Sequence, residues 1–255
     1  MKKELEVAIK AAKEAGKILK DNFHKVNPVT LKQGDSWVTE IDKLSENKII
    51  SSIKENFPTH SINAEESGFS KEDSEYLWLV DPLDGTTNYA THVPLFAVSI
   101  AQAFKNGVRF GVVYDPTHEN LYSAQKGKGA KRNNLKIKVS MTEELQKSMV
   151  GYGRPKREKK KLVEVFNKVD PVTRTPKIFG SMVLHLVYVA SGNLDVAILI
   201  SPNPWDMAAG ALIVEEAGGK VTDFEGKPWS IRSKDILASN GKIHNQLLEI
   251  LHKLA

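Results

Sequence analysis

Two aspartates, Asp81 and Asp84, are the residues whose type and spacing most clearly suggest chemistry. They lie in the stretch Asp-Pro-Leu-Asp-Gly-Thr-Thr-Asn at 81–88, directly after an apolar run at 76–80 that is short and bulky enough for a buried strand. A tight turn there would bring both carboxylates and the intervening carbonyls around one point. Oxygen ligands of this kind suit Mg²⁺, which keeps several water ligands that a substrate phosphate can replace.

The residues that follow could bind the phosphate itself. Gly85 permits close backbone approach, and Thr86 and Thr87 offer hydroxyl and N–H groups. Asp-Gly is also a common turn dipeptide, and alone it indicates an ordinary surface loop. Two further acidic stretches favour the phosphate site: Glu65-Glu66 upstream and Trp205-Asp206 downstream. Neither is specific by itself, but the combination is highly specific.

With these three stretches the sequence resembles the inositol monophosphatase family of Mg²⁺-dependent, Li⁺-sensitive sugar-phosphate phosphatases. The resemblance runs from the first predicted helix to Ala238-Ser-Asn240, nearly the whole chain. It implies an α/β (α+β) fold, a layered αβαβα sandwich of the inositol monophosphatase/fructose-1,6-bisphosphatase type, and a homodimer. It also implies two or three Mg²⁺ ions and a set of metal ligands, with Glu66 as a weaker candidate: Glu65, Asp81, the Leu83 carbonyl, Asp84 and Asp206.

The resemblance also gives Asp42 a role in the reaction. Asp42 ends the motif Val-Thr-Glu-Ile-Asp at 38–42, and the family pairs this aspartate with the first threonine of the Asp-Gly-Thr turn, here Thr86. By that match Asp42 and Thr86 activate the attacking water, since a hydroxyl beside a carboxylate can take its proton. A carboxylate at a predicted helix start can equally be an ordinary helix charge, which stabilises by about 0.3–1 kcal/mol.

The stretch Lys-Ile-Phe-Gly-Ser at 177–181 resembles the helix start that faces the substrate in this family. Inositol-selective relatives place a Glu seven residues before the Trp-Asp aspartate, where this chain has Leu199. The loss of that hydroxyl-binding carboxylate predicts weaker selectivity for inositol. The substrate contacts that the resemblance implies, with Lys32, Arg154 and Lys177 as weaker candidates, are Asp84, Gly85, Thr86, Gly180, Ser181 and Asp206.

These motifs predict a phosphoric monoester hydrolase that attacks phosphorus with water and without a covalent enzyme intermediate. Nucleophilic catalysis lacks its residues, because the chain has no cysteine and no Gly-x-Ser-x-Gly elbow. Inositol 1-phosphate ranks first as substrate. Fructose 1,6-bisphosphate is the alternative, either alone or as a second activity, and phosphoadenosine phosphate and histidinol phosphate rank lower because no adenine-stacking or imidazole-binding group can be assigned.

Apolar spacing predicts the elements that position these residues. A packing helix is expected over about 5–23 and a second helix from Asp42 onward. A strand at 61–64 ends at Glu65 as the strand at 76–80 ends at Asp81, and adjacent strand ends would lie about 4.8 Å apart. An antiparallel meander follows, and His185 in an apolar helix is expected to be a core residue. The meander strands, the later helix and strand, and the final helix with its Gly-Gly end are expected at 96–104, 108–114, 121–124, 182–190, 195–200 and 206–219.

A composition shift near Val139-Ser140 predicts two subdomains, 1–139 with the metal-binding motifs and 140–255 completing the active site. The chain has 255 residues, 41% of them hydrophobic, which is enough for a substantial core. The absence of cysteine and of any apolar run long enough to span a bilayer predicts a cytoplasmic protein with no membrane partner.

The charge leaves a second class of function open. The formal net charge is +5, the pI is near 9.1, and the stretch at 154–161 is the most basic in the chain. An RNA- or protein-binding regulator with a vestigial site would fit that patch. The patch has no interleaved aromatic residues for stacking on bases. A small sugar or polyol phosphate is therefore the expected partner, and nucleic acid is the less favoured one.

Overall fold

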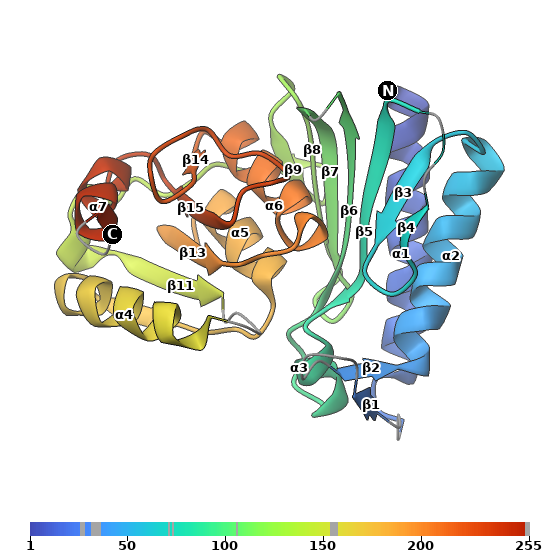
Figure 1. The fold of residues 1–255 in the computed structure, drawn as a ribbon, viewed down its shortest axis with the longest axis horizontal. Helices are drawn as coiled ribbons and strands as arrows, with labels where there is room; N and C mark the ends of the chain where they lie inside the picture. Colours follow the sequence, from blue (N-terminus) through green and yellow to red (C-terminus); the bar gives the residue numbers. More distant parts are fainter. Residues whose placement is uncertain are drawn as a thin grey trace.

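A computed structural model describes residues 1–25, 29–31, 37–70, 72, 74–105, 107–153 and 158–252 of the chain. Layers of helix and sheet alternate across it: one helix pair, an eight-stranded sheet, a central helix pair, a five-stranded sheet and a last helix pair (Figure 1). This is the predicted αβαβα sandwich. In layer order the helices are α1 (Lys2–Asn22) and α2 (Glu40–Asn56), α5 (Met182–Ala190) and α6 (Pro204–Glu216), and α4 (Lys159–Val169) and α7 (His244–Leu251).

The first sheet has the strand order β10-β9-β8-β7-β6-β5-β3-β4. All neighbours are antiparallel except β3 and β5, which run parallel. The predicted meander is confirmed as β6, β7 and β8. The strands are β3 (Ser61–Ala64), β4 (Gly68–Ser70), β5 (Tyr76–Asp84), β6 (Ala97–Phe104), β7 (Gly107–Asp115), β8 (Asn120–Gln125), β9 (Ala130–Arg132) and β10 (Leu135–Lys136).

The second sheet has the order β12-β11-β13-β15-β14, with β11 parallel to both of its neighbours and the other pairs antiparallel. The chain passes from one sheet to the other between Lys136 and Met149. The division into subdomains at residue 139 stays a prediction. The strands are β11 (Met149–Gly153), β12 (Thr175–Lys177), β13 (Val196–Ile200), β14 (Lys220–Thr222) and β15 (Asp235–Ser239).

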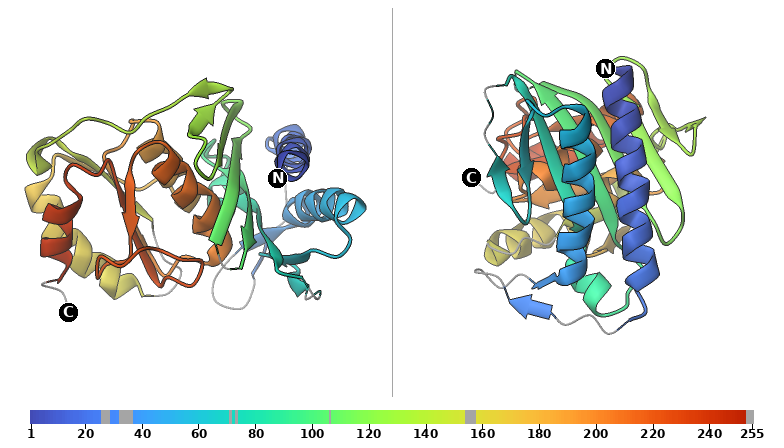
Figure 2. Two further views of the ribbon diagram at one scale, coloured as in Figure 1. Left: turned by 90° about the horizontal axis from the view of Figure 1, so that it is seen from above. Right: turned by 90° about the vertical axis from the view of Figure 1, so that its right-hand side faces the viewer.

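Helices α1 and α2 run side by side over the outer face of the first sheet (Figure 2). The buried face of α1 is built mostly of alanines, from Ala8 to Ala15, followed by Leu19. Small side chains let the helix lie close to the sheet. The buried face of α2 changes along its length, from polar at Asp42, Ser45 and Glu46 to apolar at Ile49 and Ile53. The polar half of that face lies at the site described below.

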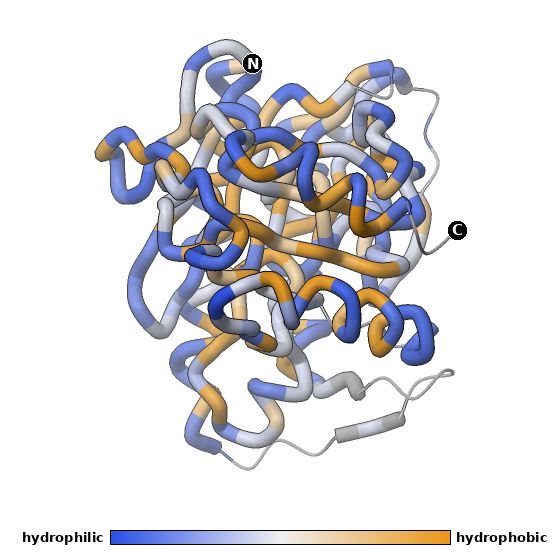
Figure 3. Tube along the Cα trace, turned by 90° about the vertical axis from the view of Figure 1, so that its left-hand side faces the viewer, coloured by the Kyte–Doolittle hydropathy of each residue, from blue (hydrophilic) through white to orange (hydrophobic). Residues whose placement is uncertain are grey.

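The central helices α5 and α6 are apolar on nearly every side, because they lie between two sheets. Hydrophobic segments run through the interior and hydrophilic segments lie mostly at the periphery (Figure 3). His185 of α5 is fully buried, as predicted. No helix in the described part of the chain has the length and apolarity needed to cross a membrane.

Several short elements were not predicted. A hairpin of β1 (Val29–Leu31) and β2 (Trp37–Thr39) precedes α2, and the short helix α3 (Thr86–Ala90) follows the Asp-Gly turn. The 3₁₀ turns at Leu145–Lys147 and Asp170–Val172 flank β11 and α4. Of these, α3 begins at Thr86, one of the predicted site residues.

Candidate active site

The two acidic strand ends lie side by side. Strands β3 and β5 are parallel, with Ala64 paired with Val80, and the Glu65 N–H donates to the Val80 carbonyl at 3.1 Å. Glu65 and Asp81 are the residues that follow these partners. The predicted adjacency of Glu65 and Asp81 is therefore confirmed. The predicted strand end at Asp81 is wrong, because β5 continues to Asp84.

A β-bulge explains how Asp81 and Asp84 come to share one side of the sheet. In a regular strand, residues three apart lie on opposite faces. Here Asp81 pairs with Ser99 and Asp84 with Ala97, so three steps on β5 match two steps on β6. The extra residue restores Asp84 to the face of Asp81. It falls next to Pro82, which has no N–H to give to the sheet.

The chain leaves the bulge through Gly85, which has φ = +99°. A Cβ atom at this position would lie 2.9 Å from the Leu95 carbonyl oxygen and would crowd Phe96. Both the left-handed conformation and the close approach therefore require glycine. The turn places Thr86 at the start of α3, where its hydroxyl lies 3.1 Å from the Leu83 carbonyl oxygen.

Asp42 reaches the same hydroxyl from helix α2. Its Oδ1 lies 3.3 Å from the Thr86 Oγ, and its Oδ2 accepts the Thr39 N–H at 2.8 Å and the Thr39 hydroxyl at 2.5 Å. These contacts form a capping box at the start of α2. Helix capping thus fixes one carboxylate oxygen of Asp42, and the other faces Thr86.

Asp84 is bound by the start of helix α5. The Ser181 hydroxyl donates to its Oδ2 at 2.5 Å, the Val183 N–H to the same oxygen at 2.7 Å, and the Met182 N–H to Oδ1 at 3.1 Å. The anion bound at this helix start is, in this structure, the carboxylate of Asp84. Gly180 precedes the helix with φ = +73°.

The turn before α5 is tied to α3 by an asparagine that sequence analysis missed. The Asn88 side-chain amide donates to the Phe179 carbonyl at 2.6 Å and to the Leu95 carbonyl at 2.7 Å. A Cβ atom at Gly180 would lie 2.7 Å from the Asn88 Oδ1, so glycine is needed for this contact. Asn88 closes the stretch at 81–88 in which the chemistry was predicted, and its position there was the available signal.

Asp206 lies in the first turn of α6 and is 8% exposed. Its Oδ2 accepts the Asn203 N–H at 2.7 Å and the Asn203 side-chain amide at 3.1 Å. The Ser99 hydroxyl donates to the Trp205 carbonyl at 3.1 Å. Since Ser99 is the cross-strand partner of Asp81, this bond places the start of α6 against the bulge.

The site concentrates negative charge. Burial raises the pKa of Asp81 well above its ordinary value, and the carboxylates of Glu65, Asp84 and Asp206 raise it further. Burial also raises the pKa of Asp84 to about 6, against the hydrogen bonds from Ser181, Val183 and Met182, which lower it. Mutual repulsion among buried carboxylates is the condition that a bound cation relieves.

The chemistry of these donors fits Mg²⁺, which prefers carboxylate and carbonyl oxygens. The side chains do not converge as the ligands of a metal ion do. Within the described ranges, no group of three or more acidic, histidine or cysteine side chains is placed to hold a metal ion. The hydrogen bonds from Ser181 and Asn203 account for the present directions of Asp84 and Asp206. The fit therefore rests on charge and donor type.

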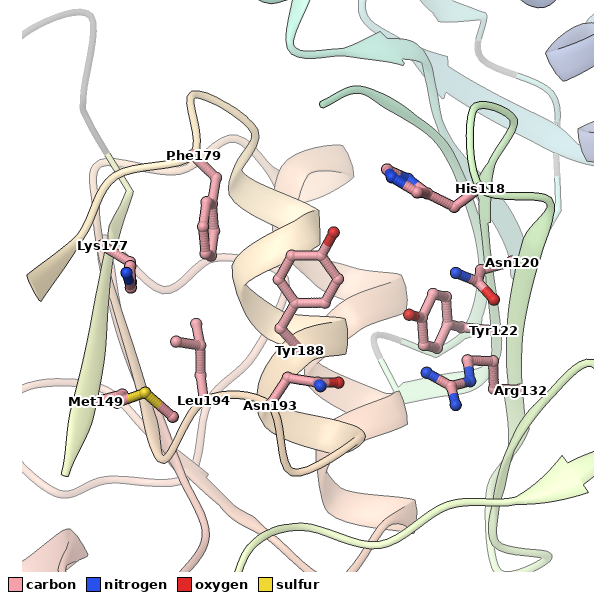
Figure 4. Close-up of a pocket in the computed structure, with 10 residues that line it drawn as sticks. All are labelled: His118, Asn120, Tyr122, Arg132, Met149, Lys177, Phe179, Tyr188, Asn193 and Leu194. Carbon is pink, nitrogen blue, oxygen red and sulfur yellow. The ribbon is translucent and has the colours of Figure 1, made fainter. Parts of the chain in front are cut away.

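Of the three weaker candidates for substrate contacts, the structure describes Lys177 alone. Lys32 and Arg154 lie outside the described residues. Lys177 is exposed and lines a pocket of about 320 Å³, together with residues of β8, β9 and α5 such as Arg132 and Tyr188 (Figure 4). None of the predicted metal ligands lines that pocket. Leu199 is fully buried in β13, so its position offers no hydroxyl-binding group.

Comparison with known proteins finds a family match along the whole chain. The chain matches the inositol monophosphatase family over residues 1–255. The "Nus factor SuhB" of Haemophilus influenzae is 38% identical over 250 residues, which cover 96% of this chain and 94% of that protein. The protein of the same name from Escherichia coli K12 is 37% identical over 254 residues, with the same coverage.

Solved structures are equally similar. The inositol monophosphatase of Anabaena is 39% identical, with a TM-score of 0.89 over 99% of this chain and 96% of that one. The Thermotoga maritima IMPase is 34% identical, with a TM-score of 0.92 over 99% and 98%. Fold, whole-chain match and sequence identity together show that the chain belongs to the inositol monophosphatase family, a family of phosphatases.

Proposed function

We propose that this chain is a Mg²⁺-dependent phosphomonoesterase that hydrolyses inositol 1-phosphate with water as the nucleophile. The observation that carries the proposal is the buried Asp81, whose pKa is raised by burial and by the carboxylates around it. Bound at this cluster, Mg²⁺ would neutralise the charge of the phosphoryl oxygens and ease ionisation of the attacking water. The residues that would hold two or three ions are Glu65, Asp81, the Leu83 carbonyl, Asp84 and Asp206.

Thr86 and Asp42 supply the proton acceptor in this proposal. A hydroxyl has one hydrogen and two lone pairs. When the Thr86 hydroxyl donates to the Asp42 Oδ1, 3.3 Å away, its oxygen can accept a hydrogen bond from the attacking water. The proton then passes through the hydroxyl to Asp42, whose other oxygen is held by Thr39. General-base assistance of this kind contributes about 10²–10⁴-fold to a rate.

The substrate contacts of the proposal come from the family resemblance. The Gly85 and Thr86 amides receive the phosphate, and Gly180, Ser181, Asp84 and Asp206 face the polyol. Release of the carboxylate of Asp84 from the start of α5 would return the Ser181 hydroxyl and the nearby amides to the substrate. Binding of Mg²⁺ by Asp84 would then free the hydrogen-bond donors of α5 for the substrate.

The order of substrates rests on Leu199 and on the solved relatives. SaIMPase-II, which is 29% identical, has been solved with inositol monophosphate and also with 2'AMP. An apolar residue at position 199 removes a hydroxyl-binding carboxylate, which weakens discrimination by about 1–3 kcal/mol. We therefore place inositol 1-phosphate first and a dual activity on fructose 1,6-bisphosphate second. A homodimer in the cytoplasm completes the proposal.

The test is Mg²⁺-dependent phosphate release from inositol 1-phosphate, fructose 1,6-bisphosphate, phosphoadenosine phosphate and histidinol phosphate, each with and without Li⁺. We expect turnover of the first two and inhibition by Li⁺. Turnover confined to either of the last two would overturn the substrate assignment and leave the chemistry standing. No release from any of the four would count against the phosphatase itself.

A regulatory role is the second candidate, and the name "Nus factor SuhB" of the two relatives described above favours it. Three lysines, Lys159–Lys161, form the first turn of α4, where the helix dipole disfavours positive charge. Lys161 pairs with Asp235 at 3.2 Å. Steeply salt-dependent RNA binding by a catalytically inactive variant would support this role. If the variant does not bind RNA even at low salt, a regulatory role that depends on RNA is excluded.

A further inference from the structure

Glu65 lies in a loop of three residues. Ala64 of β3 pairs with Gly68 of β4, so that only Glu65, Glu66 and Ser67 connect the two strands. Gly68 has φ = +77°, as is common at the residue that closes such a hairpin loop. In a loop this short, the hydrogen bonds of the backbone determine the direction in which the Glu65 side chain points.

All three N–H groups of the loop have acceptors. The Glu65 N–H donates to the Val80 carbonyl at 3.1 Å. The Glu66 N–H donates to the Oε2 of Glu46, and the Ser67 N–H to the Oε1, both at 2.8 Å. One carboxylate therefore binds two consecutive amides of the loop, and charge-assisted bonds of this kind are stronger than neutral ones.

Glu46 belongs to α2, twenty positions before Glu66, and is 2% exposed. A buried carboxylate is costly unless it is hydrogen-bonded, and here backbone amides occupy both of its oxygens. The preceding residue, Ser45, donates its hydroxyl to the Pro82 carbonyl at 2.8 Å, inside the bulge that carries Asp81 and Asp84. One face of α2 thus holds both acidic loops.

We infer that Glu46 is a positioning residue: its carboxylate fixes the Glu65-Glu66-Ser67 loop so that the Glu65 carboxylate is directed to the Mg²⁺ site. This inference rests on the proposed function. Ligand-orienting groups of this type change metal affinity by about 10–100-fold when they are replaced.

The test compares Glu46→Gln with Glu40→Gln. Glutamine preserves the size of the side chain but replaces one acceptor oxygen with an NH₂ group that faces an N–H. Glu40 is an exposed glutamate of the same helix, and its carboxylate pairs at the surface with Lys43 at 3.1 Å. Calorimetric titration of metal-free protein with Mg²⁺ measures affinity without any turnover.

We expect the Mg²⁺ Kd of Glu46→Gln to rise about 10–100-fold, and that of Glu40→Gln to stay at the wild-type value. Amide exchange at Glu66 and Ser67 should quicken in Glu46→Gln alone. High Mg²⁺ should restore turnover, which a general loss of folding would not allow. If Glu46→Gln does not fold, Glu46→Asp serves as the second variant. The shorter side chain keeps the charge but cannot reach both amides, so the Mg²⁺ Kd should rise by a smaller factor.

Unchanged Mg²⁺ affinity in Glu46→Gln or Glu46→Asp, with a wild type that binds Mg²⁺, would overturn the positioning role and leave the proposed function standing. A wild type that takes up no Mg²⁺ would overturn the proposed function first, and the positioning role with it. The wild-type titration therefore distinguishes the two failures.

Discussion

The two walls of the candidate site are held in different ways. On the wall formed by the ends of β3 and β5, the contacts come from α2, through residues 20, 37 and 44 positions away in the sequence. On the wall formed by the starts of α5 and α6, Ser181 and Asp206 make capping contacts with residues three positions away. The first wall therefore depends on the packing of α2 against the sheet, and the second on local sequence.

Hydrogen bonds at the starts of α5 and α6 join the walls. The start of α5 binds Asp84 through Ser181, Met182 and Val183, and the Ser99 hydroxyl binds the Trp205 carbonyl. The strand-end wall supplies most of the crowded charge, while the helix-start wall supplies Asp206 and the donors that moderate the charge of Asp84. Substitutions of the acidic residues, including Asp206 on the second wall, should change chemistry. Substitutions of the capping donors on the second wall, such as Ser181, should change stability and substrate binding instead.

The largest effect is expected for Asp81→Asn. Loss of this carboxylate should lower kcat/KM at least about a thousandfold, equivalent to about 4 kcal/mol. The free energy of unfolding without metal should stay equal or rise, because a buried charge is removed from repulsion by Glu65, Asp84 and Asp206. Phosphate-release kinetics and urea unfolding measure the two quantities.

Asp21→Asn is the matched control, because Asp21 is an exposed aspartate paired with Lys17 on α1. It should leave both quantities unchanged. Full activity in Asp81→Asn would contradict the assignment of the carboxylate cluster. A large loss of stability in that variant would show that the cluster serves the fold instead.

Next in size is Thr86→Val, which keeps the shape of the side chain and removes its hydroxyl. Without the contact to Asp42 at 3.3 Å, kcat should fall about 10²-fold or more, with little change in Mg²⁺ affinity. Thr86→Ser restores a hydroxyl and should recover most of the rate. Equal rates for the Val and Ser variants would remove Thr86 from the proton path.

Local sequence accounts for the contacts of the helix-start wall more readily than for those of the strand-end wall. The Trp-Asp and Gly-Ser stretches are local, so that the caps at Asp206 and Ser181 follow from neighbouring residues. The adjacency of Glu65 and Asp81 was also predicted, from two apolar strands that each end in an acid. The bulge at Pro82 was not, because it is defined only by the pairing of β5 with β6.

Ser45 and Glu46 were missed for the same reason. They lie three and four positions after Asp42, on the face that continues into Ile49 and Ile53. Polar residues on the buried face of a helix were the available signal. Their partners, Pro82 and the loop at 65–67, could not be named without the contact between α2 and β5.

The stability of the helix-start wall should depend on pH through His185. Its Nδ1 lies 2.6 Å from the Ser181 carbonyl oxygen, and its Nε2 accepts the Phe179 N–H at 3.1 Å. The neutral ring satisfies both contacts, with the hydrogen on Nδ1. Burial lowers the pKa of His185 from 6.5 to about 4. Between about pH 6.5 and 4, His185 is therefore protonated in the unfolded chain but not in the folded chain.

This contribution is fully present above pH 6.5 and is lost as the pH falls toward 4, by up to about 3 kcal/mol. In His185→Gln the amide oxygen can still accept the Phe179 N–H, and the decline of unfolding free energy between pH 6.5 and 4 should be shallower. Some decline should persist, because burial also lowers the pKa of His244 to about 4. Identical pH profiles for wild type and variant, measured by denaturant unfolding, would contradict this.

The smallest effect is expected for Ser181→Ala. The variant loses the N-cap bond to the Leu184 N–H and the bond to Asp84, which should lower the free energy of unfolding by about 1 kcal/mol. Mg²⁺ affinity should stay the same or increase, because the Asp84 carboxylate is held less firmly by α5. If Mg²⁺ affinity falls as much as it would on loss of a ligand, Ser181 supports the metal site and not only the fold.

The most direct test of the account is phosphate release by the wild-type protein, on its best substrate, before and after removal of divalent ions. The carboxylate cluster predicts that release falls to background in excess chelator and returns in full when Mg²⁺ exceeds the chelator. The Asp81→Asn variant should show neither the activity nor its return. Undiminished release in excess chelator would contradict the central claim that these carboxylates act by holding Mg²⁺.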